Sequence, residues 1–145
     1  MQDFPHHYQA TATAAEEGDV PLASAGLPEI ASAPPVEFGG PGNRWSPETL
    51  LVAAVADCFV LSFRAIARAS RLTWLGLQCD VTGTLERVER VTRFTRFEVN
   101  VRLTVPPGTD RERALKLLEK AEQTCLITNS LSATTHLQAE VTAPG

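Results

Sequence analysis

The longest apolar segment of the chain lies near its middle, between residues 46 and 70. Leucine, valine, alanine and phenylalanine occupy it without the strict alternation that marks a strand. Ser46 is a good N-cap, Pro47 suits the first helical position, and Glu48 places negative charge near the positive end of the helix dipole. The pattern therefore predicts one helix over about residues 46–70.

Two alternating segments follow this helix. Their apolar positions are Leu77, Cys79, Val81 and Leu85 in the first, and Phe97, Val99, Val101, Leu103 and Val105 in the second. Period two over this length predicts two strands, and the polar residues between them indicate a hairpin. We expect each strand to have one face in water.

A second helix, amphipathic this time, is predicted after Pro106-Pro107-Gly108, with Thr109 or Asp110 as its cap. Its apolar residues lie three and four positions apart: Ala114, Leu117, Leu118, Ala121 and Cys125. Residues 136–143 alternate enough for a closing strand, and residues 8–14, 20–23 and 28–31 are short candidate strands. The order of elements predicts an α+β fold in a single domain over residues 1–145.

The first helix needs cover on nearly all of its sides. A membrane-spanning helix needs about 20 predominantly apolar residues, and Asp57, Ser62 and Arg64 interrupt this run. We therefore expect protein rather than lipid to bury it. In a chain of 145 residues, a second subunit is the expected source of that cover.

Composition removes several classes of function. The net charge of -4 argues against nucleic-acid binding, which needs a basic face. Three cysteines without a closely spaced pair do not resemble a secreted disulfide framework. The N-terminal sequence shows no signal peptide, so we expect a cytoplasmic protein. His6, His7 and His136 lie near the ends of the chain, which disfavours a zinc site and a cysteine–histidine hydrolase, and no cofactor is expected.

Each of the three cysteines has a plain structural interpretation, because unoxidised cysteine is among the most buried residue types. Cys79 lies on the apolar face of a predicted strand, and Cys125 continues the apolar stripe of the second helix. Cys58 differs because Asp57 and Ser62 lie near it, and a plain core avoids unpaired polar groups.

A functional alternative treats Cys58 and Cys125 as a redox-active dithiol. A cysteine that attacks a peroxide must be a thiolate, which requires a pKa lowered from about 8.5 by a nearby cation or helix N-terminus. The resulting sulfenic acid condenses with a second thiol within reach. The two cysteines are 67 positions apart, so this chemistry requires the fold to bring them together.

The segments SPETLLVAAVADCF and EKAEQTCLITNS, with FGGPGNRWSPE leading into the first, resemble the OsmC/Ohr family of thiol-dependent hydroperoxide reductases. The resemblance covers essentially the whole chain. It implies an OsmC-like fold, in which a buried central helix and an amphipathic second helix pack with antiparallel sheets in an interlocked homodimer. It also implies active sites at the subunit interface, with Cys58 peroxidatic, Cys125 resolving and Glu48 in the site. The implied substrates are organic or fatty-acid hydroperoxides, and the implied reductant is a dithiol such as a lipoylated protein.

Two features qualify this picture. Ten residues of straight helix place Glu48 about 15 Å from Cys58, so a shared site needs Glu48 from another subunit or a break in the helix. The family's site also contains an arginine from the N-terminal region, whereas the first arginine here is Arg44. Arg44 is the candidate replacement, and a solvated loop arginine is the alternative interpretation. Without a cation beside it, Cys58 would lose much of its activation.

Three functions remain open from the sequence. The first is a dithiol-dependent hydroperoxide reductase that works as a homodimer, with no nucleic-acid or membrane partner. The second is a non-catalytic OsmC-like binding or structural protein with an apolar interface pocket. The third is a thiol redox sensor that uses the same two cysteines.

Overall fold

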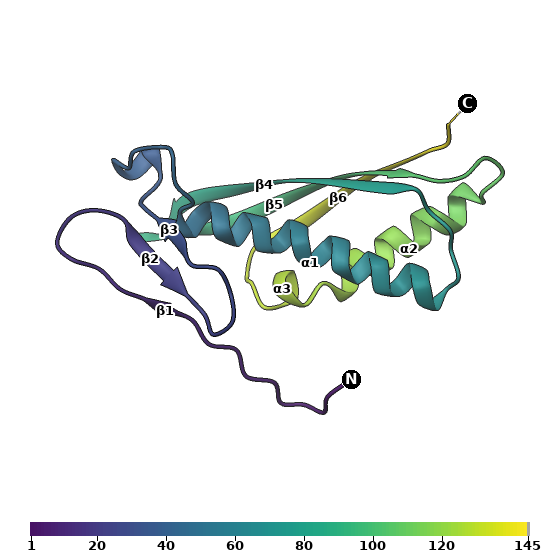
Figure 1. The fold of residues 1–145 in the computed structure, drawn as a ribbon. Helices are drawn as coiled ribbons and strands as arrows, with labels where there is room; N and C mark the ends of the chain where they lie inside the picture. Colours follow the sequence, from purple (N-terminus) through teal and green to yellow (C-terminus); the bar gives the residue numbers. More distant parts are fainter. Residues whose placement is uncertain (145) are drawn as a thin grey trace. The chain divides into compact units, whose positions relative to one another are not determined.

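A computed structural model describes residues 1–144 of the chain. The chain divides into two compact units, Met1–Leu51 and the residues from Val52 onward, and each is described by itself below. The long helix α1 (Pro47–Ala69) begins in the first unit and continues into the second (Figure 1). The single domain expected from the sequence stays a prediction.

The first unit contains a small antiparallel sheet in the order β1–β2–β3. Its strands are β1 (Thr11–Ala12), β2 (Val20–Ala23) and β3 (Ile30–Ser32). After the sheet, a loop with the 3-10 helix Val36–Phe38 returns to β3, where the Ala33 N–H donates to the Trp45 carbonyl at 3.0 Å. Gly40 is required in this loop, because a Cβ there would lie 1.6 Å from the Pro34 carbonyl oxygen.

The start of α1 is capped as the sequence predicted. Ser46 Oγ accepts from the Thr49 N–H at 3.1 Å, and Thr49 Oγ1 accepts from the Ser46 N–H at 2.8 Å. This reciprocal pair satisfies backbone donors that a helix start leaves free.

Helix α1 is less buried within one chain than the prediction of burial on nearly all sides requires. Within one chain the helix fully buries a single stripe, made of Val55, Phe59, Phe63 and Ala67. Only 28% of its most apolar stretch is buried. By length and composition α1 would also suit a membrane span, a test that the core helix of a soluble protein passes equally. One chain therefore does not bury this helix on all sides.

The second unit contains the predicted hairpin. β4 (Gly76–Val88) and β5 (Val91–Thr104) pair antiparallel, and β6 (Thr134–Thr142) adds to β5 in parallel. The parallel pair corrects the expectation of purely antiparallel sheets. Between β5 and β6 the chain crosses over through α2 (Arg111–Thr124) and α3 (Leu126–Asn129), and a crossover of this kind lets the second strand run parallel to the first.

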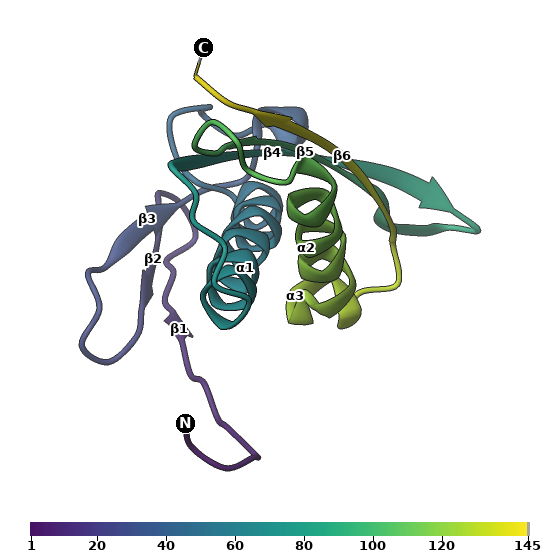
Figure 2. The same ribbon diagram turned by 90° about the vertical axis from the view of Figure 1, so that its right-hand side faces the viewer.

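The helices of the second unit lie under one face of its sheet, with α1 and α2 side by side (Figure 2). On that face Phe97, Val99, Val101 and Leu103 are buried, as the alternation predicted. Leu85, predicted on the same face, is 36% exposed. At this point the register shifts, and Thr95 of β5 is left without a paired residue on β4. Asp110 caps α2 by accepting from the Arg113 N–H at 3.2 Å.

Candidate functional site

Cys58 lines a cavity of about 430 Å³ that lies wholly in the second unit. We call it the Cys58 pocket. Its apolar walls come from α1 and α3: Ala54, Leu61, Leu126 and Ile127. Cys58 faces it together with Ala54 and Ser62, which lie four positions before and after it and so share its face of the helix. Asp57 also lines the pocket. An apolar pocket with a thiol at its wall suits an apolar reactant.

Cys125 lies at the junction between α2 and α3 and is 2% exposed. Burial raises the pKa of the Cys125 thiol, while hydrogen bonding from the backbone and side chain of Thr128 opposes that rise. The Cys58 thiol is close enough to raise the pKa of Cys125 further, by hydrogen bonding and by charge. The fold therefore brings together two cysteines that lie 67 positions apart in the sequence, and both are free thiols.

Ser62 is the polar neighbour of Cys58. Its Oγ lies 3.9 Å from Cys58 Sγ, one turn further along α1. A hydroxyl in this position can turn its proton toward a thiolate. The sequence drew attention to Ser62 as a polar residue near Cys58, but it held no signal for Thr128. Thr128 lies in α3, and its Oγ1 donates to the Cys125 carbonyl at 3.1 Å.

Cys79 lies outside the Cys58 pocket, on β4 in register with the buried Val101. Burial, followed by the charges of Asp80 and Cys125, raises the pKa of Cys79 to about 11. Its thiol is therefore protonated at neutral pH. A protonated, partly buried thiol is a poor nucleophile, which agrees with the structural interpretation of this residue.

Glu48 lines a second cavity, of about 480 Å³, that lies wholly in the first unit. We call it the Glu48 cavity. Its walls are mainly apolar side chains from the small sheet, the 3-10 helix and the first turn of α1. Glu48 Oε1 is buried and has no hydrogen-bond partner among residues 1–144. Since buried polar atoms in proteins are almost always paired, this oxygen is an exception among the described residues.

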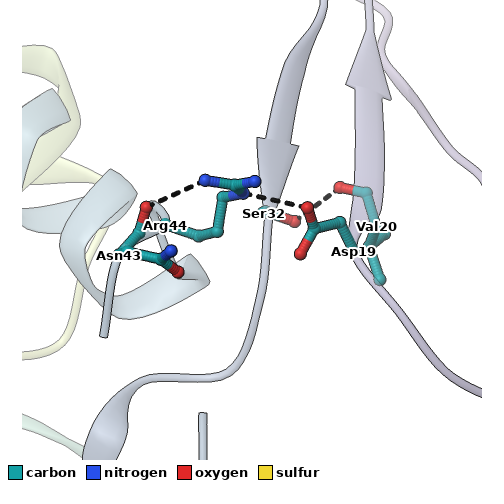
Figure 3. Close-up of polar contacts among 5 residues, drawn as sticks. All are labelled: Asp19, Val20, Ser32, Asn43 and Arg44. Carbon is teal, nitrogen blue, oxygen red and sulfur yellow. Dashed lines mark hydrogen bonds and ion pairs between the residues drawn. The ribbon is translucent and has the colours of Figure 1, made fainter. Parts of the chain in front are cut away.

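Arg44, the candidate cation, is engaged with another residue. Its Nε donates to Asp19 Oδ2 at 2.9 Å and its Nη1 donates to the Asn43 carbonyl at 3.2 Å. Figure 3 shows the guanidinium between the loop and the residue that precedes β2. Within the described part of the chain, no hydrogen bond or ion pair joins Arg44 to Glu48. The pair with Asp19 spans 25 positions and was not foreseen from the sequence.

Glu48 and Cys58 lie on one continuous helix, Pro47–Ala69. The alternative of a break between them is therefore wrong. Ten residues of helix separate them by about 15 Å along the axis. The two side chains of one chain do not meet.

Comparisons with known proteins agree with these features. Residues 40–140 match the family described as OsmC-like protein. The chain is 30% identical over 111 residues to the uncharacterized protein YmaD of Bacillus subtilis strain 168, covering 73% of each chain. It is 28% identical over 121 residues to the organic hydroperoxide resistance protein of Xanthomonas axonopodis pv. citri strain 306, covering 83% of each chain.

Solved structures share the fold. An OsmC-like protein of unknown function from Vibrio cholerae superimposes with a TM-score of 0.85 at 17% identity, over 94% of this chain and 100% of that one. An organic hydroperoxide resistance protein from Elizabethkingia anophelis gives a TM-score of 0.78 at 20% identity, over 99% and 100% of the two chains. These likenesses confirm the predicted OsmC-like α+β fold.

Proposed function

The chain belongs to the OsmC-like protein family, and on that premise we propose that it is a thiol-dependent peroxidase for organic hydroperoxides. Cys58 is the peroxidatic cysteine and Cys125 the resolving cysteine. The observation that carries the proposal is that Cys58 lines an apolar pocket and lies within reach of the buried Cys125 thiol. The similarity to an organic hydroperoxide resistance protein supports a role in peroxide resistance.

The reaction balances with these two thiols and one external reductant. The Cys58 thiolate attacks the outer oxygen of the hydroperoxide, the O–O bond breaks, and the departing alkoxide takes a proton to become the alcohol. Cys58 is left as a sulfenic acid. The Cys125 thiol then attacks the Cys58 sulfur, so that a disulfide forms and the hydroxyl leaves with the thiol proton as water. A dithiol, such as that of a lipoylated protein, reduces the disulfide by exchange.

The surroundings of the two thiols suit this order of events. Cys58 faces the pocket, and the Ser62 hydroxyl 3.9 Å away can donate to its thiolate. Cys125 is buried, and its raised pKa keeps it protonated in the resting protein. The thiol that faces the pocket therefore reacts first and the buried thiol second.

The walls of the pocket favour organic peroxides over hydrogen peroxide. Leu61 and Leu126 stand at its edge and are 49% and 65% exposed. An alkyl group that covers such surface gains about 25 cal/mol for each Å² removed from water. Hydrogen peroxide offers no such group, so we expect a bulky aromatic hydroperoxide to be the better substrate.

We propose that a homodimer completes the site. One chain covers a single stripe of α1, and it leaves Glu48 Oε1 without a donor among residues 1–144. Because Glu48 and Cys58 of one chain are held apart on a continuous helix, Glu48 can serve Cys58 only in a second copy. Sedimentation at micromolar concentration should give a dimer, and a fully active monomer would contradict this part of the proposal. The cytoplasmic location stays a prediction.

The test of the function is consumption of cumene hydroperoxide with dihydrolipoamide as reductant. Wild type should turn over, Cys58→Ser should be at least 100-fold slower, and the matched control Cys79→Ser should stay within twofold of wild type. Hydrogen peroxide in parallel should be the poorer substrate. Turnover by Cys58→Ser at the wild-type rate would overturn the assignment of Cys58.

A second candidate function is a non-catalytic binding protein with the same fold. The observation that favours it is the ion pair of Arg44 with Asp19, which gives the candidate cation a partner other than the site. No turnover by folded wild type with free thiols would support it. Disulfide formation without sustained turnover would instead support a redox sensor.

A further inference from the structure

Cys58 and Cys125 differ in how a reductant can reach them once they are joined as a disulfide. Cys58 lines the Cys58 pocket, whereas Cys125 is 2% exposed and is not part of the pocket lining. A second copy can only add to the cover of Cys125, so this difference also holds in a dimer. An incoming thiolate therefore attacks the sulfur of Cys58, and Cys125 is the leaving group.

Thr128 places a hydroxyl next to this leaving group. Cys125 immediately precedes α3, and Thr128 lies within that short helix. Thr128 Oγ1 donates to the Cys125 carbonyl at 3.1 Å, and the Asn129 N–H donates to the same carbonyl at 3.0 Å. These two bonds hold the turn and keep the hydroxyl against Cys125. Burial raises the pKa of the Cys125 thiol, and hydrogen bonding from the backbone and hydroxyl of Thr128 acts against that rise.

We infer that Thr128 stabilises the Cys125 thiolate when it leaves the disulfide, and so speeds the return of the protein to its reduced state. While Cys125 is a thiol or part of a disulfide, the hydroxyl donates to the carbonyl. When the thiolate forms, the hydroxyl turns toward the sulfur. As a statement about a catalytic cycle the inference rests on the proposed function, but the exchange reaction itself requires only the disulfide and a dithiol.

The exchange balances with one dithiol. One thiolate of the dithiol attacks Cys58 Sγ, the S–S bond breaks, and Cys125 leaves with the electron pair as a thiolate that then takes a proton from solvent. The second thiol of the dithiol, after it loses its proton, attacks the reductant's own sulfur in the mixed disulfide and releases Cys58 as a thiolate. Two electrons pass to the protein, and the dithiol becomes a cyclic disulfide.

The size of the effect follows from the charge that develops on sulfur. Hydrogen bonds to an ionised group are about twice as strong as those between neutral groups, so the Thr128 hydroxyl stabilises the departing thiolate more than the disulfide. A sulfur that is more stable as a thiolate also leaves faster. Loss of the hydroxyl alone, with the Thr128 N–H retained, should therefore slow the exchange about threefold to tenfold.

Three variants separate the hydroxyl from the shape of the side chain. Thr128→Val removes the hydroxyl and keeps the shape, and Thr128→Ser keeps the hydroxyl. The matched control is Thr124→Val, because the Thr124 hydroxyl adjoins Cys125 in the sequence but donates to the Lys120 carbonyl at 2.8 Å.

The reaction to follow is reduction of the preformed disulfide. Each protein also carries Cys79→Ser, so that Cys58 and Cys125 are its only thiols. Diamide joins them without peroxide, and dihydrolipoamide then reduces the disulfide at neutral pH. Samples quenched with acid at successive times are alkylated, and their free thiols are counted by mass spectrometry. Alkylation of Cys58 by iodoacetamide in the reduced proteins serves as a second readout.

We expect reduction of Thr128→Val to be at least threefold slower than that of the parent, and Thr128→Ser and Thr124→Val to stay within twofold of it. Alkylation of Cys58 should be equal in all four proteins. Glutathione in place of the dithiol should form its mixed disulfide on Cys58 and leave Cys125 as the free thiol.

Several results would overturn the inference. They are equal reduction rates for Thr128→Val and Thr124→Val, a loss that Thr128→Ser does not restore, an equal loss in the alkylation of Cys58, which marks a merely structural role, and a glutathione adduct on Cys125. Failure of diamide to join Cys58 to Cys125 would overturn it as well. Because this test needs no peroxide, failure of the peroxidase proposal would appear separately, as absent consumption of cumene hydroperoxide.

Discussion

The Cys58 pocket and the Glu48 cavity are similar in volume, about 430 and 480 Å³, and both have mainly apolar walls. They differ in what surrounds their reactive groups. In the second unit, Cys58 has the Ser62 hydroxyl beside it and Cys125 has Thr128. In the first unit, Glu48 Oε1 is buried with no partner among residues 1–144, although an arginine stands four positions before it in the sequence.

The comparison separates the residues of the proposed reaction from the unpartnered carboxylate. Both thiols of the proposed reaction, and the hydroxyls that support them, belong to one unit. Glu48 belongs to the other unit, and its Oε1 has no hydrogen-bond partner among residues 1–144. Variants in the Cys58 pocket should therefore alter the chemistry directly, whereas variants in the Glu48 cavity should act on the completion of the site.

The largest effect after loss of Cys58 itself should come from Cys125→Ser. Without a second thiol, Cys58 sulfenic acid accumulates and oxidises further to the sulfinic acid. We expect sustained turnover with dihydrolipoamide to fall at least tenfold, and the intact mass of the treated protein to show added oxygen. Wild-type turnover by this variant would remove Cys125 from the mechanism and leave the Cys58 pocket with a single functional thiol.

On the other side of the comparison, Glu48→Gln tests whether the unpartnered carboxylate has a function. Glutamine keeps the size of the side chain, and its carbonyl oxygen can still accept a hydrogen bond from a second copy, so the melting temperature should change little. Turnover should nevertheless fall about fivefold to tenfold if a second copy uses this carboxylate.

The matched control for that variant is Glu37→Gln, an exposed glutamate that does not line the Glu48 cavity. Its turnover and melting temperature should both stay at the wild-type values. If Glu48→Gln also turned over at the wild-type rate, the carboxylate would have no part in the reaction.

A smaller effect is expected from Ser62→Ala. The loss of one hydroxyl donor to the Cys58 thiolate should slow alkylation of Cys58 by iodoacetamide about twofold to fivefold at neutral pH. Ser62→Thr keeps the hydroxyl and should restore the rate. Equal rates in wild type and Ser62→Ala would show that the 3.9 Å contact contributes nothing to the reactivity of Cys58.

The ion pair of Arg44 with Asp19 should matter less. Both side chains are 41% exposed, and surface pairs of this kind contribute about 0–1 kcal/mol. Arg44→Ala and Asp19→Ala should therefore lower the melting temperature by similar small amounts and change turnover less than twofold. A tenfold loss of turnover in Arg44→Ala alone would contradict this expectation and identify Arg44 as the cation of the proposed site.

The last effect concerns stability at alkaline pH and leaves turnover at neutral pH unchanged. The pKa of Cys79 is about 11 in the folded chain, against an ordinary value of 9.0. Because the folded state holds this proton more tightly than the unfolded state, its contribution to stability is present below pH 9 and lost as the pH rises through 11. The free energy of unfolding in urea should fall less steeply between these pH values in Cys79→Ser than in wild type. Identical slopes would contradict the assigned cause.

Local patterns in the sequence were enough to predict the main elements. Ser46 and Pro47 indicate where α1 begins because a cap is a local hydrogen-bonding event. The alternation around Val99 and Val101 predicts the inner face of β5 because the period of a strand is fixed by its backbone. The fold class follows from the order of these elements, and the resemblance in the two cysteine segments predicted the family.

Features that depend on distant residues were beyond these patterns. The register shift between Thr84 and Leu85 and the parallel pairing of β6 depend on how the strands pair. The partner of Arg44 lies 25 positions away. Likewise, sequence identified Cys58 and Cys125 as residue types suited to one reaction, but only the packing of α1 beside α2 and α3 determines that they are neighbours.

The central claim is that Cys58 and Cys125 form one dithiol site, and disulfide mapping tests it most directly. The reduced protein is treated with one equivalent of cumene hydroperoxide, remaining thiols are blocked with iodoacetamide, and the peptides are identified by mass spectrometry. We predict a Cys58–Cys125 disulfide within each chain, with Cys79 recovered as the alkylated thiol. Recovery of Cys58 as an unreacted thiol, or a disulfide that joins Cys58 to Cys79, would contradict the account.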